Sequence, residues 1–142
     1  KAGSIAIDRK AGMGALKQIL RRAEPVVADG RQIIIFPEGT RVPPFAETAW
    51  HPGVSALYGR FSASSSTPQA PVVPVALNSG VFWGRNSFIK RPGTIVVRIL
   101  PPMPADMDKK TFMAELHARI DGTSNELAAD AGAHPPDSRK TD

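Results

Sequence analysis

The alternation of apolar and polar residues predicts three helices along the chain. Over Gly12–Glu24 the apolar residues recur at every third or fourth position, opposite a face that carries lysine and arginine, which indicates an amphipathic helix. Pro25 is expected to kink or end this helix, because proline lacks the backbone donor. A short helix is predicted over Pro52–Gly59, with the proline in its first turn. Helical spacing predicts a third helix over Asp108–Ala129.

Four apolar runs predict strands: Ser4–Asp8, Ile33–Phe36, Val72–Leu77 and Thr94–Leu100. The run over Ile33–Phe36 is typical of a strand buried on both faces, because its four consecutive residues are apolar and mostly β-branched. The order strand, helix, strand at the start of the chain predicts a right-handed βαβ unit. The expected fold class is therefore α/β, with a mixed, largely parallel central sheet flanked by helices.

Length and composition describe an ordinary globular domain. The 142 residues fit one domain, and the hydrophobic share of 42% and charged share of 22% are usual for soluble folds. No apolar run reaches the roughly 20 residues of a membrane-spanning helix. The chain has no cysteine, which excludes disulfides and thiolate metal sites and suits a reducing compartment.

Charge is divided unevenly along the chain. Residues 1–100 carry 13 Lys and Arg against 5 Asp and Glu, a balance of +8, whereas residues 101–142 carry 5 against 8, a balance of −3, which together give the net charge of +5. A basic body favours an anionic partner, such as a phosphate-bearing substrate, acidic lipid headgroups or nucleic acid. Nucleic acid is disfavoured, because the chain has 9 aromatic residues and no recognised nucleic-acid motif. A solvated basic surface is the plain alternative.

The run IIIFPEGTR, Ile33 to Arg41, carries the most specific chemistry. Pro37 helps to end the strand, and Gly39 lets the backbone approach a ligand closely. Arg41 supplies a planar fork of donors that matches a phosphate. The segment is thus expected to deliver an anion-binding loop to the carboxyl edge of a sheet. A strand, a turn and a surface salt bridge between Glu38 and Arg41 form the alternative interpretation.

Three segments, in this order, resemble the conserved blocks of the glycerolipid acyltransferase family, most closely those of the bacterial 1-acyl-sn-glycerol-3-phosphate acyltransferases. SIAIDR, Ser4 to Arg9, is similar to the second block of the family, and FPEGTR, Phe36 to Arg41, matches the third letter for letter. VVPVAL, Val72 to Leu77, is similar to the fourth. The resemblance covers nearly residues 1–130. It implies the fold of that family, incomplete at the N-terminus.

The resemblance also implies an activity and a site. The family transfers a fatty acyl group from acyl-CoA or acyl carrier protein to the free hydroxyl of a lysophospholipid. By resemblance, Arg9 and Arg41 bind the glycerol phosphate, and Glu38, Gly39 and Thr40 shape the site. Two guanidinium groups suit a phosphomonoester dianion. Pro74 belongs by resemblance to the acyl-donor side, although a structural proline at the start or edge of a strand is the equal alternative.

The first block of the family, a histidine followed by four residues and an aspartate, is absent from the chain. The block supplies the general base for the acceptor hydroxyl, a role that suits a His–Asp pair. None of the three histidines has an aspartate five positions later. We therefore expect the chain to be part of a longer protein in which this block precedes Lys1, and the 142 residues alone to be inactive. His51 is interpreted as a loop residue near the phosphate site, and no function is assigned to His117 or His134.

These inferences define the expected domain, partners and location. Residues 1–131 are expected to form the C-terminal portion of an acyltransferase domain, and residues 132–142 a disordered tail. The resemblance implies lysophosphatidic acid and a thioester donor as partners, a membrane surface at the cytoplasmic face of the cell membrane, and neither metal nor cofactor. A non-catalytic module for anionic lipid or phosphate, and an acyltransferase for another lysolipid, are the alternatives.

Overall fold

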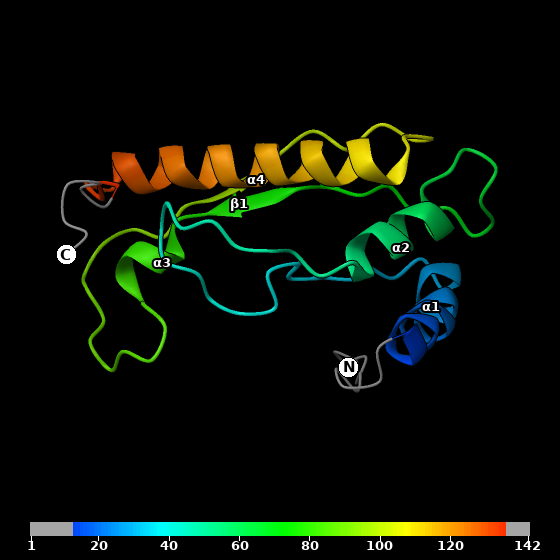
Figure 1. The fold of residues 1–142 in the computed structure, drawn as a ribbon, viewed down its shortest axis with the longest axis horizontal. Helices are drawn as coiled ribbons and strands as arrows, with labels where there is room; N and C mark the ends of the chain where they lie inside the picture. Colours follow the sequence, from blue (N-terminus) through cyan, green and yellow to red (C-terminus); the bar gives the residue numbers. More distant parts are fainter. Residues whose placement is uncertain (1–12, 136–142) are drawn as a thin grey trace. The chain divides into compact units, whose positions relative to one another are not determined.

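A computed structural model describes residues 13–135 (Figure 1). Its elements are α1 (Met13–Ala28), α2 (Gly53–Phe61), β1 (Val75–Leu77), α3 (Ser79–Phe82), β2 (Val97–Ile99) and α4 (Lys109–Asp130). The chain forms two compact units. Among the described residues, the first comprises 13–37, His51–Val72 and Pro102–Met113, and the second comprises Glu38–Trp50, Val73–Pro101 and 114–135. None of the helices within residues 13–135 has the length and apolar character needed to span a bilayer.

In the first unit, α1 packs against α2. Ala23 of α1 is completely buried, and the Ile19 side chain contacts Gly53 so closely that a Cβ at position 53 would lie 3.3 Å from it. The buried side of α2 is formed by Gly53, Val54, Tyr58 and Phe61. The predicted helix over Pro52–Gly59 is therefore confirmed, with its boundary shifted by one to two residues.

Pro25 was expected to kink or end α1. It does not end the helix, which continues to Ala28 with the proline inside it, and a kink stays a prediction. Proline cannot donate a backbone hydrogen bond, but its carbonyl can accept one, and the Pro25 carbonyl accepts from the Asp29 N–H at 3.0 Å. The helix ends at Ala28, and Gly30, two residues later, has a left-handed φ of +68°. The N–H groups of Gly30 and Arg31 donate to the carbonyls of Val27 and Val26, which closes the terminus.

The core of the first unit is built around two stacked aromatic rings. The rings of Tyr58 and Phe112 lie 3.8 Å apart at an interplanar angle of 11°, and Phe112 is fully buried. The Tyr58 hydroxyl donates to the Pro104 carbonyl and accepts from the Met107 N–H, each at 2.8 Å. The segment that precedes α4 is thereby fixed to α2.

The start of α4 confirms the helix predicted over Asp108–Ala129. The Asp108 carboxylate accepts hydrogen bonds from the N–H groups of Lys110 and Thr111, both at 3.0 Å, and so caps the helix. Hydrogen bonds from Thr111, first from its side chain and then from its backbone N–H, hold the pKa of Asp108 below its ordinary value. Gly122 does not interrupt the helix, which runs to Asp130.

In the second unit, β1 and β2 form a two-stranded antiparallel sheet in which Val75 pairs with Ile99 and Leu77 with Val97. The buried amide of Asn78 joins this sheet to α4. Its Oδ1 accepts from the Val96 N–H at 2.9 Å, and its Nδ2 donates to the Leu127 carbonyl at 3.3 Å. One side chain therefore satisfies a backbone group just before β2 and another in α4, which are distant in sequence.

The expected largely parallel sheet is not formed by residues 13–135, whose two strands are antiparallel. Ile33–Phe36 is not a strand, and the exposed fractions of Ile34 and Phe36 are 81% and 73%. The physical reason is the absence of a ladder partner for this segment within residues 13–135, because a strand is stable only beside another strand. The strand predicted over Ser4–Asp8 lies outside the described residues.

Candidate functional site

The last four residues of the FPEGTR motif lie in the second unit, where Glu38 belongs to a turn and Gly39 and Thr40 form a bend. Gly39 has a φ of +66°, a left-handed conformation that costs other residues free energy. The turn leaves Glu38 partly buried and both Thr40 and Arg41 exposed. The motif thus presents a hydroxyl and a guanidinium to solvent, and their role in binding an anion stays a prediction. Arg9, the expected second guanidinium, lies outside the described residues.

Arg41 packs over an aromatic ring. Its guanidinium carbon lies 5.5 Å from the centroid of the Trp83 ring, and the Lys90 Nζ lies 4.4 Å from the same centroid. Such contacts orient a cation without neutralising it. Within residues 13–135, no carboxylate forms an ion pair with Arg41, so the alternative of a Glu38–Arg41 salt bridge is wrong. The charge of Arg41 remains available to an anion.

A second cluster surrounds Glu38. On α4, the His117 Nδ1 lies 3.3 Å from the Asp121 Oδ2. Burial raises the pKa of Glu38, the negative charge of Asp121 raises it further, and the charge of His117 opposes both effects. Burial also raises the pKa of Asp121, against the lowering effect of His117. Burial therefore favours the protonated forms of both carboxyl groups, and the charge of His117 favours their ionised forms. Within residues 13–135, no three such side chains are arranged to hold a metal ion.

Trp50 covers the imidazole of this cluster. Its ring centroid lies 4.7 Å from that of His117 at an interplanar angle of 48°, and its buried Nε1 has no hydrogen-bond partner among the described residues. Sequence reasoning assigned no function to His117. The available signal was the spacing of His117 and Asp121, four residues apart on a predicted helix, which places both side chains on one face.

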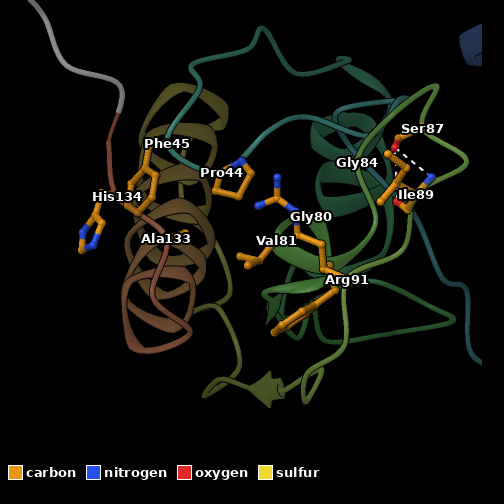
Figure 2. A pocket seen from close by; sticks show the side chains of 11 residues that line it. Pro44, Phe45, Gly80, Val81, Gly84, Ser87, Ile89, Arg91, Ala133 and His134 are labelled. Atoms are coloured by element: carbon orange, nitrogen blue, oxygen red, sulfur yellow. Dashed lines mark hydrogen bonds between the residues drawn. The ribbon is translucent and has the colours of Figure 1, made fainter.

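A cavity of about 330 Å³ lies in the second unit (Figure 2). Phe45 and His134 approach it from one side and Arg91 from the other. Its walls are formed by residues that follow the motif, by α3 and the loop after it, and by the segment after α4: Pro44, Phe45, Gly80, Val81, Phe82, Gly84, Ser87, Ile89, Arg91, Ala133 and His134. Mostly apolar walls with a cationic group suit an amphipathic anion. His134, to which the sequence analysis assigned no function, is one of the residues that line this cavity.

Two further residues considered in the sequence analysis, Pro74 and His51, lie outside the two clusters and the cavity described above. Pro74 is fully buried immediately before β1, and its carbonyl accepts from the Leu100 N–H at 3.0 Å. This position fits the structural alternative, and a role on the acyl-donor side stays a prediction. His51 is exposed in the first unit, where its backbone N–H donates to the Pro37 carbonyl at 2.8 Å.

Comparison with known proteins gives consistent matches. Residues 1–78 match the family described as Acyltransferase. A 1-acyl-sn-glycerol-3-phosphate acyltransferase of Pseudomonas aeruginosa is 35% identical over 126 residues, which cover 89% of this chain and 46% of that protein. A 1-acyl-sn-glycerol-3-phosphate acyltransferase alpha of Homo sapiens is 31% identical over 111 residues, which cover 74% and 35%. The chain thus spans less than half the length of these curated relatives. No solved structure matches it significantly.

Proposed function

Because the chain belongs to the acyltransferase family, we propose that the whole protein transfers a fatty acyl group to the free hydroxyl of 1-acylglycerol 3-phosphate, giving phosphatidic acid. The names of the relatives from Pseudomonas aeruginosa and Homo sapiens support this acceptor. The proposed donor is a thioester, acyl-CoA or acyl carrier protein. No cofactor takes part in this transfer. The observation that carries the proposal is the exposed Arg41, which has no carboxylate partner among the described residues and lies over Trp83.

In this proposal, Arg41 binds the phosphate of the acceptor together with Arg9. The guanidinium groups would neutralise the dianion and fix its orientation. The Gly39 turn brings backbone close to the ligand, and the Thr40 hydroxyl adds a further donor. Holding the phosphate places the acceptor hydroxyl beside the thioester, where positioning reduces the barrier.

The reaction needs a base to remove the proton of the acceptor hydroxyl. The hydroxyl oxygen forms a bond to the thioester carbonyl carbon, the carbon–sulfur bond breaks, and the thiol leaves with a proton. We assign the base to a His-x4-Asp pair, which the 142 residues do not contain. The 142 residues alone are therefore proposed to be inactive, and a pair from other residues of the whole protein completes the site.

The proposal extends to the fold and the location of the whole protein. The exposed apolar side chains of Ile34 and Phe36 support a larger, mainly parallel sheet in which Ile33–Phe36 gains strand neighbours. A lysolipid acceptor places the enzyme at a membrane surface, and its cytoplasmic face is the proposed location because acyl-CoA and acyl carrier protein are soluble donors.

The test uses the protein expressed from its complete gene and two acceptors that differ only in the phosphate. With acyl-CoA or acyl carrier protein as donor, 1-acylglycerol 3-phosphate is expected to give phosphatidic acid, and 1-acylglycerol is expected to react far more slowly. Equal rates with both acceptors would reject the phosphate site. Binding of lysophosphatidic acid without turnover would favour the non-catalytic module, and faster turnover of another lysolipid would reassign the acceptor.

The 142 residues provide a separate control. They are expected to show no transfer under the same conditions. Robust transfer would contradict the assignment of the base to other residues and would direct attention to the pair of His117 and Asp121 on α4.

A further inference from the structure

The segment after α3 forms a protruding loop with a closed neck, Trp83 to Arg91, here called the 83–91 loop (Figure 1). At the neck, the Arg91 N–H donates to the Phe82 carbonyl at 2.9 Å. Gly93 has a φ of +157°, and a Cβ at this position would overlap the Phe82 ring. Both ends of the 83–91 loop are therefore held close to Phe82. This closure defines the loop as a separate protruding segment.

The tip of the 83–91 loop presents large apolar side chains to solvent. Asn86 is left-handed, with a φ of 55°, and the Ser87 hydroxyl accepts a hydrogen bond from the Ile89 N–H at 3.1 Å. This local turn holds Phe88 between them. The exposed fractions are 104% for Phe88, 74% for Ile89 and 47% for Trp83. A local hydrogen bond thus keeps a phenylalanine in water rather than in the core.

Cationic residues flank this apolar tip in the sequence. Arg85, Lys90 and Arg91 are all exposed, and the Lys90 Nζ lies 4.4 Å from the Trp83 ring centroid. The sequence contains no aspartate or glutamate from Asn78 to Ala105, so no local acid offsets this charge. Exposed apolar side chains flanked by cations are complementary to an anionic bilayer, whose charged headgroups cover an apolar layer of acyl chains.

We propose that the 83–91 loop is the contact of the protein with an anionic lipid bilayer. Phe88 enters the boundary between headgroups and acyl chains, the Trp83 indole lies at the headgroup level, and Arg85 and Lys90 bind lipid phosphates. The inference deepens the proposed function and rests on it for the role of the bilayer as the source of acceptor. Since Arg41 packs on Trp83, the same contact would hold the phosphate site at the membrane surface.

The first experiment measures binding to vesicles with the protein expressed from its complete gene. Vesicles of phosphatidylcholine with phosphatidylglycerol are compared with phosphatidylcholine alone by flotation. Phe88→Ser is expected to weaken binding to the anionic vesicles by about tenfold, and Arg85→Gln by about fivefold. Ile99→Ser is the matched control, because Ile99 is 73% exposed on β2, and it is expected to change binding less than twofold. Equal effects of Phe88→Ser and Ile99→Ser would overturn the inference.

The second experiment locates the loop in wild-type protein. Lipids brominated along the acyl chain quench an indole only when it lies near the apolar layer. The quenching due to Trp83 is the difference between the wild-type protein and Trp83→Phe. This difference is expected to exceed the quenching that remains in Trp83→Phe from other tryptophans. Salt-sensitive adsorption without quenching of Trp83 would indicate contact by charge alone and reject insertion.

Turnover separates this inference from the proposed function. With a short-chain lysolipid dissolved as monomer, Phe88→Ser is expected to retain wild-type turnover, and with the acceptor in vesicles it is expected to lose most of it. Loss of turnover in Arg41→Ala with normal vesicle binding by Phe88→Ser would reject the membrane contact and leave the enzyme assignment intact. Vesicle binding that depends on Phe88, without acylation of any lysolipid, would support the membrane contact and reject the enzyme assignment.

Discussion

The guanidinium carbon of Arg41 lies 5.5 Å from the centroid of the Trp83 ring, and no carboxylate among residues 13–135 pairs with it. An aromatic face restricts the motion of an arginine but leaves its N–H donors directed outward. A carboxylate partner would instead occupy those donors. The FPEGTR motif therefore ends in a cation that is oriented and still able to bind an anion.

Replacing Arg41 is expected to disable the acceptor site. Arg41→Ala should lower kcat/KM for 1-acylglycerol 3-phosphate by about 100-fold, the range for removing a charged hydrogen-bond donor. Arg41→Lys should recover part of this loss, because it restores the charge without the planar fork. Arg98→Ala is the control, since Arg98 pairs with Glu126 at 3.4 Å on the surface. Equal kinetics of Arg41→Ala and Arg98→Ala would contradict the assignment.

Glu38 is expected to make stability depend on pH. The pKa of Glu38 is raised in the folded state. At low pH Glu38 is protonated in both the folded and the unfolded state, and its contribution to the free energy of unfolding is then complete. As pH rises above about 4, the unfolded state ionises first, so the free energy of unfolding falls until the raised pKa is passed. In Glu38→Gln this decline should be smaller, as measured by urea denaturation between pH 4 and pH 7.

Asp108 gives a control of opposite sign for that measurement. Its pKa is lowered by hydrogen bonds from the start of α4, so its contribution is present above its ordinary pKa and is lost as pH falls through the lowered value. Asp108→Asn should therefore reduce the loss of stability as pH falls, whereas Glu38→Gln should reduce the loss of stability as pH rises. Identical pH profiles for the two variants would show that neither carboxyl group is perturbed as described.

Asn78 is expected to contribute strongly to the stability of the second unit. Asn78→Ala removes the hydrogen bonds to the Val96 N–H and the Leu127 carbonyl and should cost about 2 to 3 kcal/mol in the free energy of unfolding. Asn125→Ala is the matched control, because Asn125 accepts one bond, from the Phe45 N–H at 3.0 Å. Denaturation that shows the larger loss in Asn125→Ala would refute the bridging role.

Phe112 should be the most sensitive aromatic position of the first unit. Phe112→Ala removes a fully buried ring stacked on Tyr58 and is expected to cost about 4 kcal/mol. Phe88→Ala provides the same chemical change at a fully exposed position and should alter stability by about 0.5 kcal/mol or less. Thermal and urea denaturation of both variants measure the difference, and similar values would show that the ring is not part of the core.

The helices could be predicted from sequence because their determinants are local. The apolar spacing of α1, α2 and α4 and the capping aspartate Asp108 lie within a few residues of what they specify. Pro25 does not end α1, which continues to Ala28 and is followed by the left-handed Gly30. The apolar run over Ile33–Phe36 specifies a preference for burial but cannot specify the strand beside it.

The candidate site was only partly predictable for the same reason. The turn at Gly39 and the exposed Arg41 follow from residues adjacent in the motif. The influence of Asp121 and His117 on Glu38 depends on α4 packing within the second unit, across about 80 residues of sequence. The contact of Arg41 with Trp83 depends on tertiary structure in the same way. Site features that depend on one segment could be predicted from sequence, and interactions between residues of distant segments could not.

The uncovered side chains of Ile34 and Phe36 govern how the chain behaves at high concentration. A short uncharged run of β-branched and aromatic residues outside any ladder is a template to which a second molecule can add its own run. Concentrated solutions of the 142 residues will therefore form intermolecular β-bridges through this segment while the helices remain intact. A charged residue within the run would oppose such growth, since stacked copies would bring like charges together.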